Sequence, residues 1–182
     1  DINSGQVVGA EALMRWDHPS RGVVNPEEFI PLAERSGLIE RLGRMAFEQA
    51  ANQTREWIKA LPGLGEDFFV SINLSPTQLA SESLLNDIRG LASGSKDLIG
   101  HLKLEVTESL LIDDPDRVLA TLQVLKEAGV RISLDDFGTG YSSLSYLKRF
   151  PFDKIKIDRS FVSQMEKNAD SMSIIRAVIA LG

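Results

Sequence analysis

Five short apolar runs, each followed by a stretch with helical periodicity, restrict most strongly how this chain can fold. The runs cover residues 7–16, 68–74, 102–108, 132–136 and 152–158. No low-complexity linker interrupts the series. Strands that alternate with helices build a parallel sheet, because each helix returns the chain to the start of the next strand. The sequence therefore predicts one α/β domain built on a parallel sheet.

Local signals predict where several of the helices begin and end. Asn25 and Pro26 fit the N-cap and the first position of a helix, and Gly37 ends it. Asp114-Pro115 opens another helix, which Gly129 closes. The periodicity predicts further helices over residues 38–61, 76–92, 143–148 and 174–179.

The composition excludes several classes of protein. With 182 residues, 43% apolar and 25% charged, the chain resembles ordinary globular domains. Its net charge of −6 argues against a basic groove for a DNA or RNA polymer, although it permits a phosphate ligand if divalent cations lie between. The absence of cysteine excludes disulfides and thiolate zinc sites. Because the chain starts at Asp1 and has no membrane-length apolar run, we expect a domain excised from a longer protein.

Polar residues within or at the ends of the predicted strands separate two possible sheets. The six residues are Glu11, Asn73, Glu105, Asp135, Asp136 and Lys156. A (β/α)8 barrel brings such side chains to one mouth, whereas an open doubly wound sheet gathers them near a switch point. Convergence of six groups favours the barrel. The count of five strands, against the eight of a complete barrel, does not.

The adjacent carboxylates of Asp135 and Asp136 are the strongest indication of chemistry. They repel each other, and a strand end tolerates them when a cation or strong donors offset the repulsion. The alternative is a helix N-cap in an acidic loop. Carboxylate and amide oxygens suit Mg²⁺ or Mn²⁺, and two such ions ~3.5–4 Å apart clamp a phosphodiester for attack by water.

Lys156 has two interpretations at this stage. It is the cation nearest to the acids in the predicted barrel, so it could orient a water or stabilise charge on a phosphate. It could equally pair with Asp136 or Asp158 and hold the barrel mouth together. The sequence does not decide between them.

Five segments together resemble the EAL domain family of bacterial cyclic di-GMP phosphodiesterases. They read Glu11-Ala12-Leu13 followed by Arg15-Trp16, then SINLS at 71–75, LEVTES at 104–109, DDFGTGYSSL at 135–144 and KID at 156–158. The order and spacing match the family across essentially the whole chain. The resemblance implies a modified (β/α)8 barrel of the TIM type that hydrolyses cyclic di-GMP to linear pGpG with Mg²⁺ or Mn²⁺.

The resemblance also implies a role for each matching residue. The implied metal ligands are Glu11, Asn73, Glu105, Asp135 and Asp136. The implied catalytic residues are Glu11, Asp135, Asp136 and Lys156, and Lys156 contacts the attacking water. Arg15, Leu13 and Asp136 contact the substrate, with Arg15 on a phosphate. Glu108 anchors a loop that contains Gly138, Thr139, Gly140 and Ser142. Ca²⁺ is expected to occupy the metal site without supporting hydrolysis.

Several expectations concern the protein beyond residues 1–182. The family's first, seventh and eighth strands would lie outside this range, so we expect a partial EAL domain. The resemblance implies a homodimer, a bacterial cytoplasmic location, and sensor or cyclase-like domains elsewhere in the protein, with an inner-membrane anchor left open. Two alternatives remain: a cyclic di-GMP receptor without turnover, and an inactive fragment of a larger phosphodiesterase. Degenerate receptors usually lose Glu11 or the Asp135–Asp136 pair, and both are present here.

Overall fold

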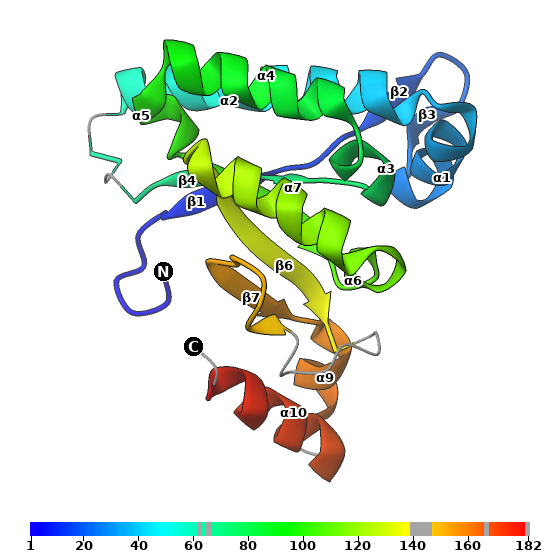
Figure 1. Ribbon diagram of the computed structural model, residues 1–182, viewed down its shortest axis with the longest axis vertical. Coiled ribbons are helices and arrows are strands. Elements are labelled where there is room, and N and C mark those ends of the chain that lie inside the picture. The colour runs from blue at the N-terminus through cyan, green and yellow to red at the C-terminus, as the bar shows by residue number, and fades with distance from the viewer. Residues whose placement is uncertain (62, 65–66, 139–146, 166–167, 181–182) are drawn as a thin grey trace.

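A curled parallel sheet forms the centre of the computed structural model (Figure 1). The structure describes residues 1–61, 63–64, 67–138, 147–165 and 168–180. The strand order is β1-β4-β5-β6-β7, with consecutive strands parallel. Their bounds are Gly9–Ala12, Phe69–Asn73, Leu102–Thr107, Arg131–Phe137 and Lys154–Ile157. The five predicted strands are therefore present in a sheet shaped like half a barrel.

Helices cover the outer face of the sheet (Figure 1). The longer helices are α1 (Pro26–Ser36), α2 (Ile39–Ala60), α4 (Glu82–Gly94), α7 (Pro115–Glu127) and α10 (Ala169–Ile179). The shorter helices are α3 (Pro76–Leu79), α5 (Lys96–Ile99), α6 (Leu110–Asp113) and α9 (Arg159–Gln164). Leu102, Leu104 and Val106 of β5 are fully buried in the core cluster, together with Leu122 of α7.

The other face of the sheet carries the polar residues. Because side chains alternate along a strand, Lys103 and Glu105 point away from the apolar face of β5. Lys103 is buried, and its ammonium lies 3.2 Å from the ring centroid of Phe69. Burial and then the nearby charge of Lys154 lower the pKa of Lys103 from 10.5 to about 8. The concave face is therefore a charged surface with a buried cation.

The first strand is shorter than the sequence predicts. Only Gly9–Ala12 pairs with β4, and Trp16–His18 instead forms β2 of an antiparallel hairpin with β3 (Gly22–Val24). The apolar run 7–16 gives no sign of this break in the strand. Trp16 leaves the sheet and packs edge-on against Phe29 of α1. The predicted single strand was wrong in length.

One helix prediction needs correction, and the short helices α5, α6 and α9 were not predicted. The helix predicted over residues 76–92 is divided into α3 and α4, because the Ser81 side chain accepts a hydrogen bond from Ser83 N and starts a new helix. Helix α9 was not predicted, although Asp158 caps it by accepting from Ser160 N at 2.8 Å. Most of the helix predicted over 143–148 lies outside the described residues.

The capping signals were read correctly. Asn25 accepts from Glu27 N, Gly37 adopts a left-handed φ of 73°, and Asp114 accepts from Arg117 N.

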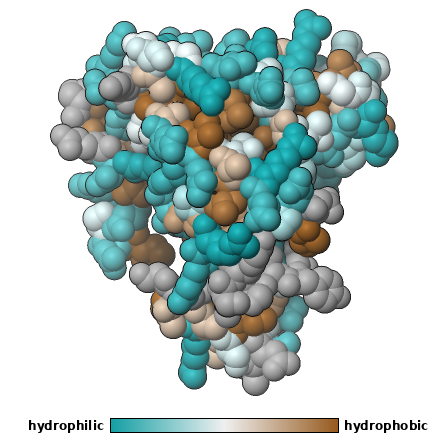
Figure 2. Space-filling model, in the orientation of Figure 1, coloured by the Kyte–Doolittle hydropathy of each residue, from teal (hydrophilic) through white to brown (hydrophobic). Residues whose placement is uncertain are grey.

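Figure 2 shows mostly polar side chains over this face of the molecule, with small apolar patches between them. Within the described part of the chain, no helix has both the length and the apolar character needed to cross a membrane.

Candidate active site

The predicted polar residues lie along one rim of the sheet. Glu11, Asn73 and Glu105 stand on β1, β4 and β5, and Asp135 and Lys156 on β6 and β7. Asn73 is directly beside Glu105 in the register, and Asp135 is beside Thr107. Because all five strands run in the same direction, their carboxyl ends meet at this edge.

Lys156 joins two of the acids. Its ammonium donates to Glu105 Oε2 at 2.7 Å and to Asp135 Oδ2 at 2.6 Å. Burial alone would lower the pKa of Lys156, but the hydrogen bonds to Asp135 and Glu105 together raise it above its ordinary value. In this arrangement Lys156 is therefore held as an ammonium that donates to both acids. The structural interpretation of Lys156 named Asp136 or Asp158, whereas its two ion pairs here are with Glu105 and Asp135.

Glu11 and Asn73 form a second contact on the same rim. Asn73 Nδ2 donates to Glu11 Oε1 at 2.7 Å across the β1–β4 pair. Both side chains are exposed. The hydrogen bond orients the amide so that its oxygen stays available as a ligand.

Asp136 has a special backbone conformation. Its φ of 53° is the only positive φ among the non-glycine residues that the structure describes. Its backbone N–H donates to Asp135 Oδ1 at 2.9 Å, which ties the two acids together. Burial, then the charges of Asp135 and Asp158, raise the pKa of Asp136 despite the opposing effect of Lys156. Left-handed backbone costs ~1–2 kcal/mol in an L-residue, and Asp is among the residues that tolerate it.

Glu108 lies just beyond β5 and is almost completely buried, with 1% of its surface exposed. Its Oε2 accepts from Gly138 N at 2.8 Å, at the end of β6. This is the contact expected of a residue that anchors the following loop. Three of the predicted loop residues, Thr139, Gly140 and Ser142, lie outside the described part of the chain.

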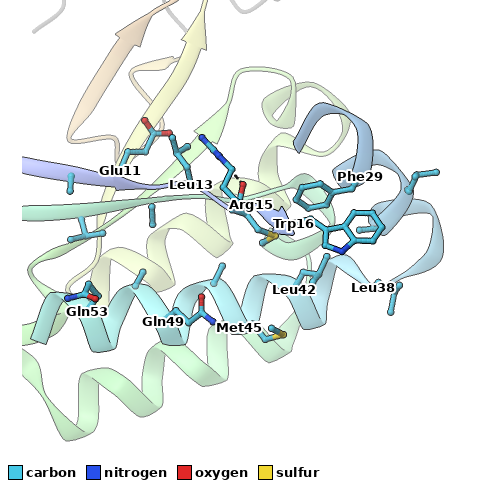
Figure 3. A pocket seen from close by; sticks show the side chains of 18 of the residues that line it. Glu11, Leu13, Arg15, Trp16, Phe29, Leu38, Leu42, Met45, Gln49 and Gln53 are labelled. Atoms are coloured by element: carbon cyan, nitrogen blue, oxygen red, sulfur yellow. Dashed lines mark hydrogen bonds between the residues drawn. The ribbon is translucent and has the colours of Figure 1, made fainter. Parts of the chain in front are cut away.

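Leu13 and Arg15 follow β1 on an exposed segment. Arg15 Nη1 donates to the Met14 carbonyl at 2.8 Å. Together with Glu11 they line one side of a cavity of about 1040 Å³, and α1 and α2 provide the other side, including Leu42 and Met45 (Figure 3). The cavity is mostly apolar, so the charged groups at its edge, and not its interior, are suited to a phosphate.

The donor set suits a hard divalent cation, as carboxylate and amide oxygens do. Glu105 and Asp135 already converge on one positively charged atom, the Lys156 ammonium. Among the described residues, however, no three or more acidic or histidine side chains gather closely enough to hold a metal ion. Four of the five predicted ligands thus lie in two separate contacts, Glu11 with Asn73 and Glu105 with Asp135 through Lys156, and Asp136 is joined to Asp135 by its backbone N–H.

A model of the EAL domain family matches residues 1–182. The chain is an EAL domain. It is 43% identical over 179 residues to the bifunctional diguanylate cyclase/cyclic di-GMP phosphodiesterase MucR of Pseudomonas aeruginosa, covering 98% of this chain and 26% of MucR. It is 38% identical over 177 residues to the cyclic di-GMP phosphodiesterase PdeR of Escherichia coli, covering 97% of this chain and 26% of PdeR.

Solved structures confirm the fold of this EAL domain. The MucR phosphodiesterase in complex with c-di-GMP superposes with a TM-score of 0.86 at 43% identity, over 96% of this chain and 70% of that one. The EAL enzyme Bd1971, bound to cAMP and cyclic di-GMP, gives 0.86 at 31% identity, over 99% and 49%. The predicted barrel-type α/β fold is therefore confirmed in preference to the doubly wound sheet.

The EAL domain spans only a part of its relatives. It covers 21%, 26% and 21% of the length of three curated relatives, so most of each relative lies outside the match. Phosphodiesterases of this family generally depend on a divalent metal. The resemblance found in the five sequence segments is thus confirmed at the level of the family.

Proposed function

We propose that this EAL domain hydrolyses cyclic di-GMP to linear pGpG as part of a longer signalling phosphodiesterase. The observation that carries the proposal is the rim on which Glu105 and Asp135 meet at Lys156. This rim occurs in a chain 43% identical to the MucR phosphodiesterase, whose structure contains c-di-GMP. Degenerate, non-hydrolytic relatives are expected to lose the acids that are retained here.

The metal would be Mg²⁺ or Mn²⁺ at a two-ion site. The residues that would hold it are Glu11, Asn73, Glu105, Asp135 and Asp136. Bound divalent cations supply Lewis acidity toward a phosphate oxygen and lower the pKa of a water molecule. We propose that Ca²⁺ binds the same oxygens without supporting turnover.

Residues of this chain would orient the attacking water and the phosphate. The water oxygen forms a bond to phosphorus while the bond to the ribose 3′ oxygen breaks, and that oxygen leaves with a proton. Lys156 stays an ammonium because its pKa is raised. It would therefore donate to the attacking water and orient it, or donate to a phosphate oxygen and stabilise the negative charge that develops there. Arg15 would hold a phosphate, and exposed Leu13 would contact the substrate beside it.

The assembly follows from the family resemblance. We propose a homodimer, with sensor or cyclase-like domains in the rest of the protein and a location in the bacterial cytoplasm. Ordering of the loop that Glu108 anchors would be linked to dimerisation and to metal binding. The contact from Glu108 Oε2 to Gly138 N gives such coupling a physical route into β6.

A receptor that binds cyclic di-GMP without turnover is the second candidate. Calorimetric titration of cyclic di-GMP into the full-length protein with Ca²⁺, followed by product analysis after exchange to Mn²⁺, separates the two. Binding in Ca²⁺ and pGpG in Mn²⁺ support the enzyme. Binding without product supports the receptor, and no binding contradicts both.

A further inference from the structure

Helix α9 packs against the end of β6 at Gly138. Gly138 has a φ of +105°, and a Cβ built there would lie 2.7 Å from Cε2 and 3.0 Å from Cζ of Phe161. Phe161 stands on the first half of α9, and α9 lies beside the carboxyl end of β6 (Figure 1). The ring therefore lies directly against the backbone at Gly138, where no larger residue fits without a shift.

Two hydrogen bonds fix the same junction from either side. Asp158 N donates to the Phe137 carbonyl at 3.2 Å, which ties the start of α9 to β6. Gly138 N donates to buried Glu108. The ring of Phe161 supplies the third contact, and it is the only one of the three made by an apolar side chain.

This junction lies two residues beyond the strained acid. Asp135 is held at one end by Lys156, and Gly138 is held at the other by Glu108 and Phe161. Between them Asp136 keeps a left-handed φ of 53°. A backbone held at both ends in this way retains a conformation that an isolated chain would leave.

We propose that Phe161 is a positioning residue for the acidic rim: its ring on Gly138 fixes how the chain leaves β6 and so keeps Asp135 and Asp136 in place. The proposal rests on the proposed function, because it assigns those acids to metal binding. Partners that hydrogen-bond directly to metal ligands typically contribute about 10- to 100-fold to metal affinity or activity. Phe161 acts through the backbone at Gly138, so we expect the lower end of that range.

The test compares variants of the full-length protein. Phe161→Ala removes the ring, and Phe161→Leu keeps part of the apolar bulk in case the alanine variant folds poorly. Val162→Ala is the matched control, since Val162 is the next residue on α9 and is 47% exposed. Gly138→Ala, alone and combined with Phe161→Ala, tests whether the two residues act through their contact. Each protein is measured for Mn²⁺ affinity by calorimetry, for kcat/KM with cyclic di-GMP, and for melting temperature.

Phe161→Ala should weaken Mn²⁺ binding and lower kcat/KM by about 10-fold, while Val162→Ala changes neither. Phe161→Leu should fall between them. In the Gly138→Ala background, loss of the ring also relieves a clash, so Phe161→Ala should cost less there than in the wild type.

A lowered melting temperature with unchanged Mn²⁺ affinity and kcat/KM would overturn the proposal and leave Phe161 as a packing residue. Fully additive effects with Gly138→Ala would do the same. A wild type that binds Mn²⁺ without turnover would contradict the proposed enzyme, and the Mn²⁺ affinities would still decide the role of Phe161. A wild type that does neither would overturn both.

Discussion

Lys156 lies between two carboxylates that would otherwise repel each other. The Glu105 side chain is only 4% exposed, whereas that of Asp135 is 20% exposed, so Glu105 is the more deeply buried partner of Lys156. Removing one partner of such a pair costs more than removing an exposed one, because a buried charge is left without compensation. The lysine thus stabilises the rim as well as serving the proposed reaction.

Replacing this lysine tests its structural role. Lys156→Met should lower the free energy of unfolding by roughly 1–3 kcal/mol, measured by urea denaturation at neutral pH. Arg21→Met is the control, because its ion pair with Glu28 is about half exposed on both sides. It should change stability by less than about 1 kcal/mol. Equal effects of the two variants would show that Glu105 is compensated by another group.

The lowered pKa of Lys103 predicts how the stability of the protein depends on pH. Its pKa of about 8 in the folded state lies below its ordinary 10.5, so the unfolded chain binds more protons between these values. The free energy of unfolding should therefore rise with pH from about 8 to 10.5. Lys103→Met should be more stable than the wild type below pH 8 and should lose this rise.

Urea denaturation at several pH values measures that difference. Lys59→Met, on the exposed surface of α2, controls for the loss of a lysine charge. A wild type whose stability does not increase over the window, relative to Lys103→Met, would contradict the buried cation.

At the scale of elements, α3 connects the rim to helix α2. It follows Asn73 within three residues and has a capping box in which Ser75 N donates to Gln78 Oε1 at 3.0 Å. A Cβ on Gly43 of α2 would lie 1.4 Å from Gln78 Nε2. Gly43 therefore leaves the space that the capping glutamine occupies.

Gly43→Ala should destabilise the protein by about 1–3 kcal/mol, because the new methyl group displaces Gln78 from the capping box. Gly90→Ala on α4 is the matched control, since nothing lies within 4 Å of its added Cβ. It should be neutral or stabilising by about 0.4–1 kcal/mol. The midpoints of urea unfolding of the two variants are compared with that of the wild type. A stabilising Gly43→Ala would contradict the described packing.

Elements with local signals could be predicted, and those that depend on distant contacts could not. Asn25 with Pro26 and Asp114 with Pro115 carry their caps in the sequence, so α1 and α7 began where expected. The hairpin of β2 and β3 depends on Trp16 packing against α1, which no local pattern reveals. Asp158 was read as the end of a strand because the helix it caps is only six residues long.

The candidate site shows the same division. Strand alternation places Glu105, Asp135 and Lys156 on one rim, because parallel strands end at the same edge. Alternation does not fix which charges meet, and the partners of Lys156 came from the register of β5, β6 and β7. Nothing in the sequence indicated the positioning role of Phe161, because that role depends on contact between its ring on α9 and Gly138 at the end of β6.

At the scale of the whole molecule, stability should differ between the middle of the sheet and its edge. β5 pairs on both sides and is buried along nearly its whole length, whereas β1 pairs only with β4 among the described residues and is largely exposed or half-buried. In residues 1–182, amides of β5 should exchange only through global unfolding, and those of β1 faster through local opening. Equal protection in hydrogen exchange would contradict the half-barrel arrangement.

Formation of pGpG by the wild type and by Asp135→Asn, in the same Mn²⁺ buffer, tests the central claim most directly. The substitution removes a ligand charge but little volume, so we expect loss of product with a melting temperature close to that of the wild type. Product from the wild type alone is the predicted result. Equal product from both proteins, or cooperative melting lost in Asp135→Asn, would contradict the assignment of this acid to catalysis.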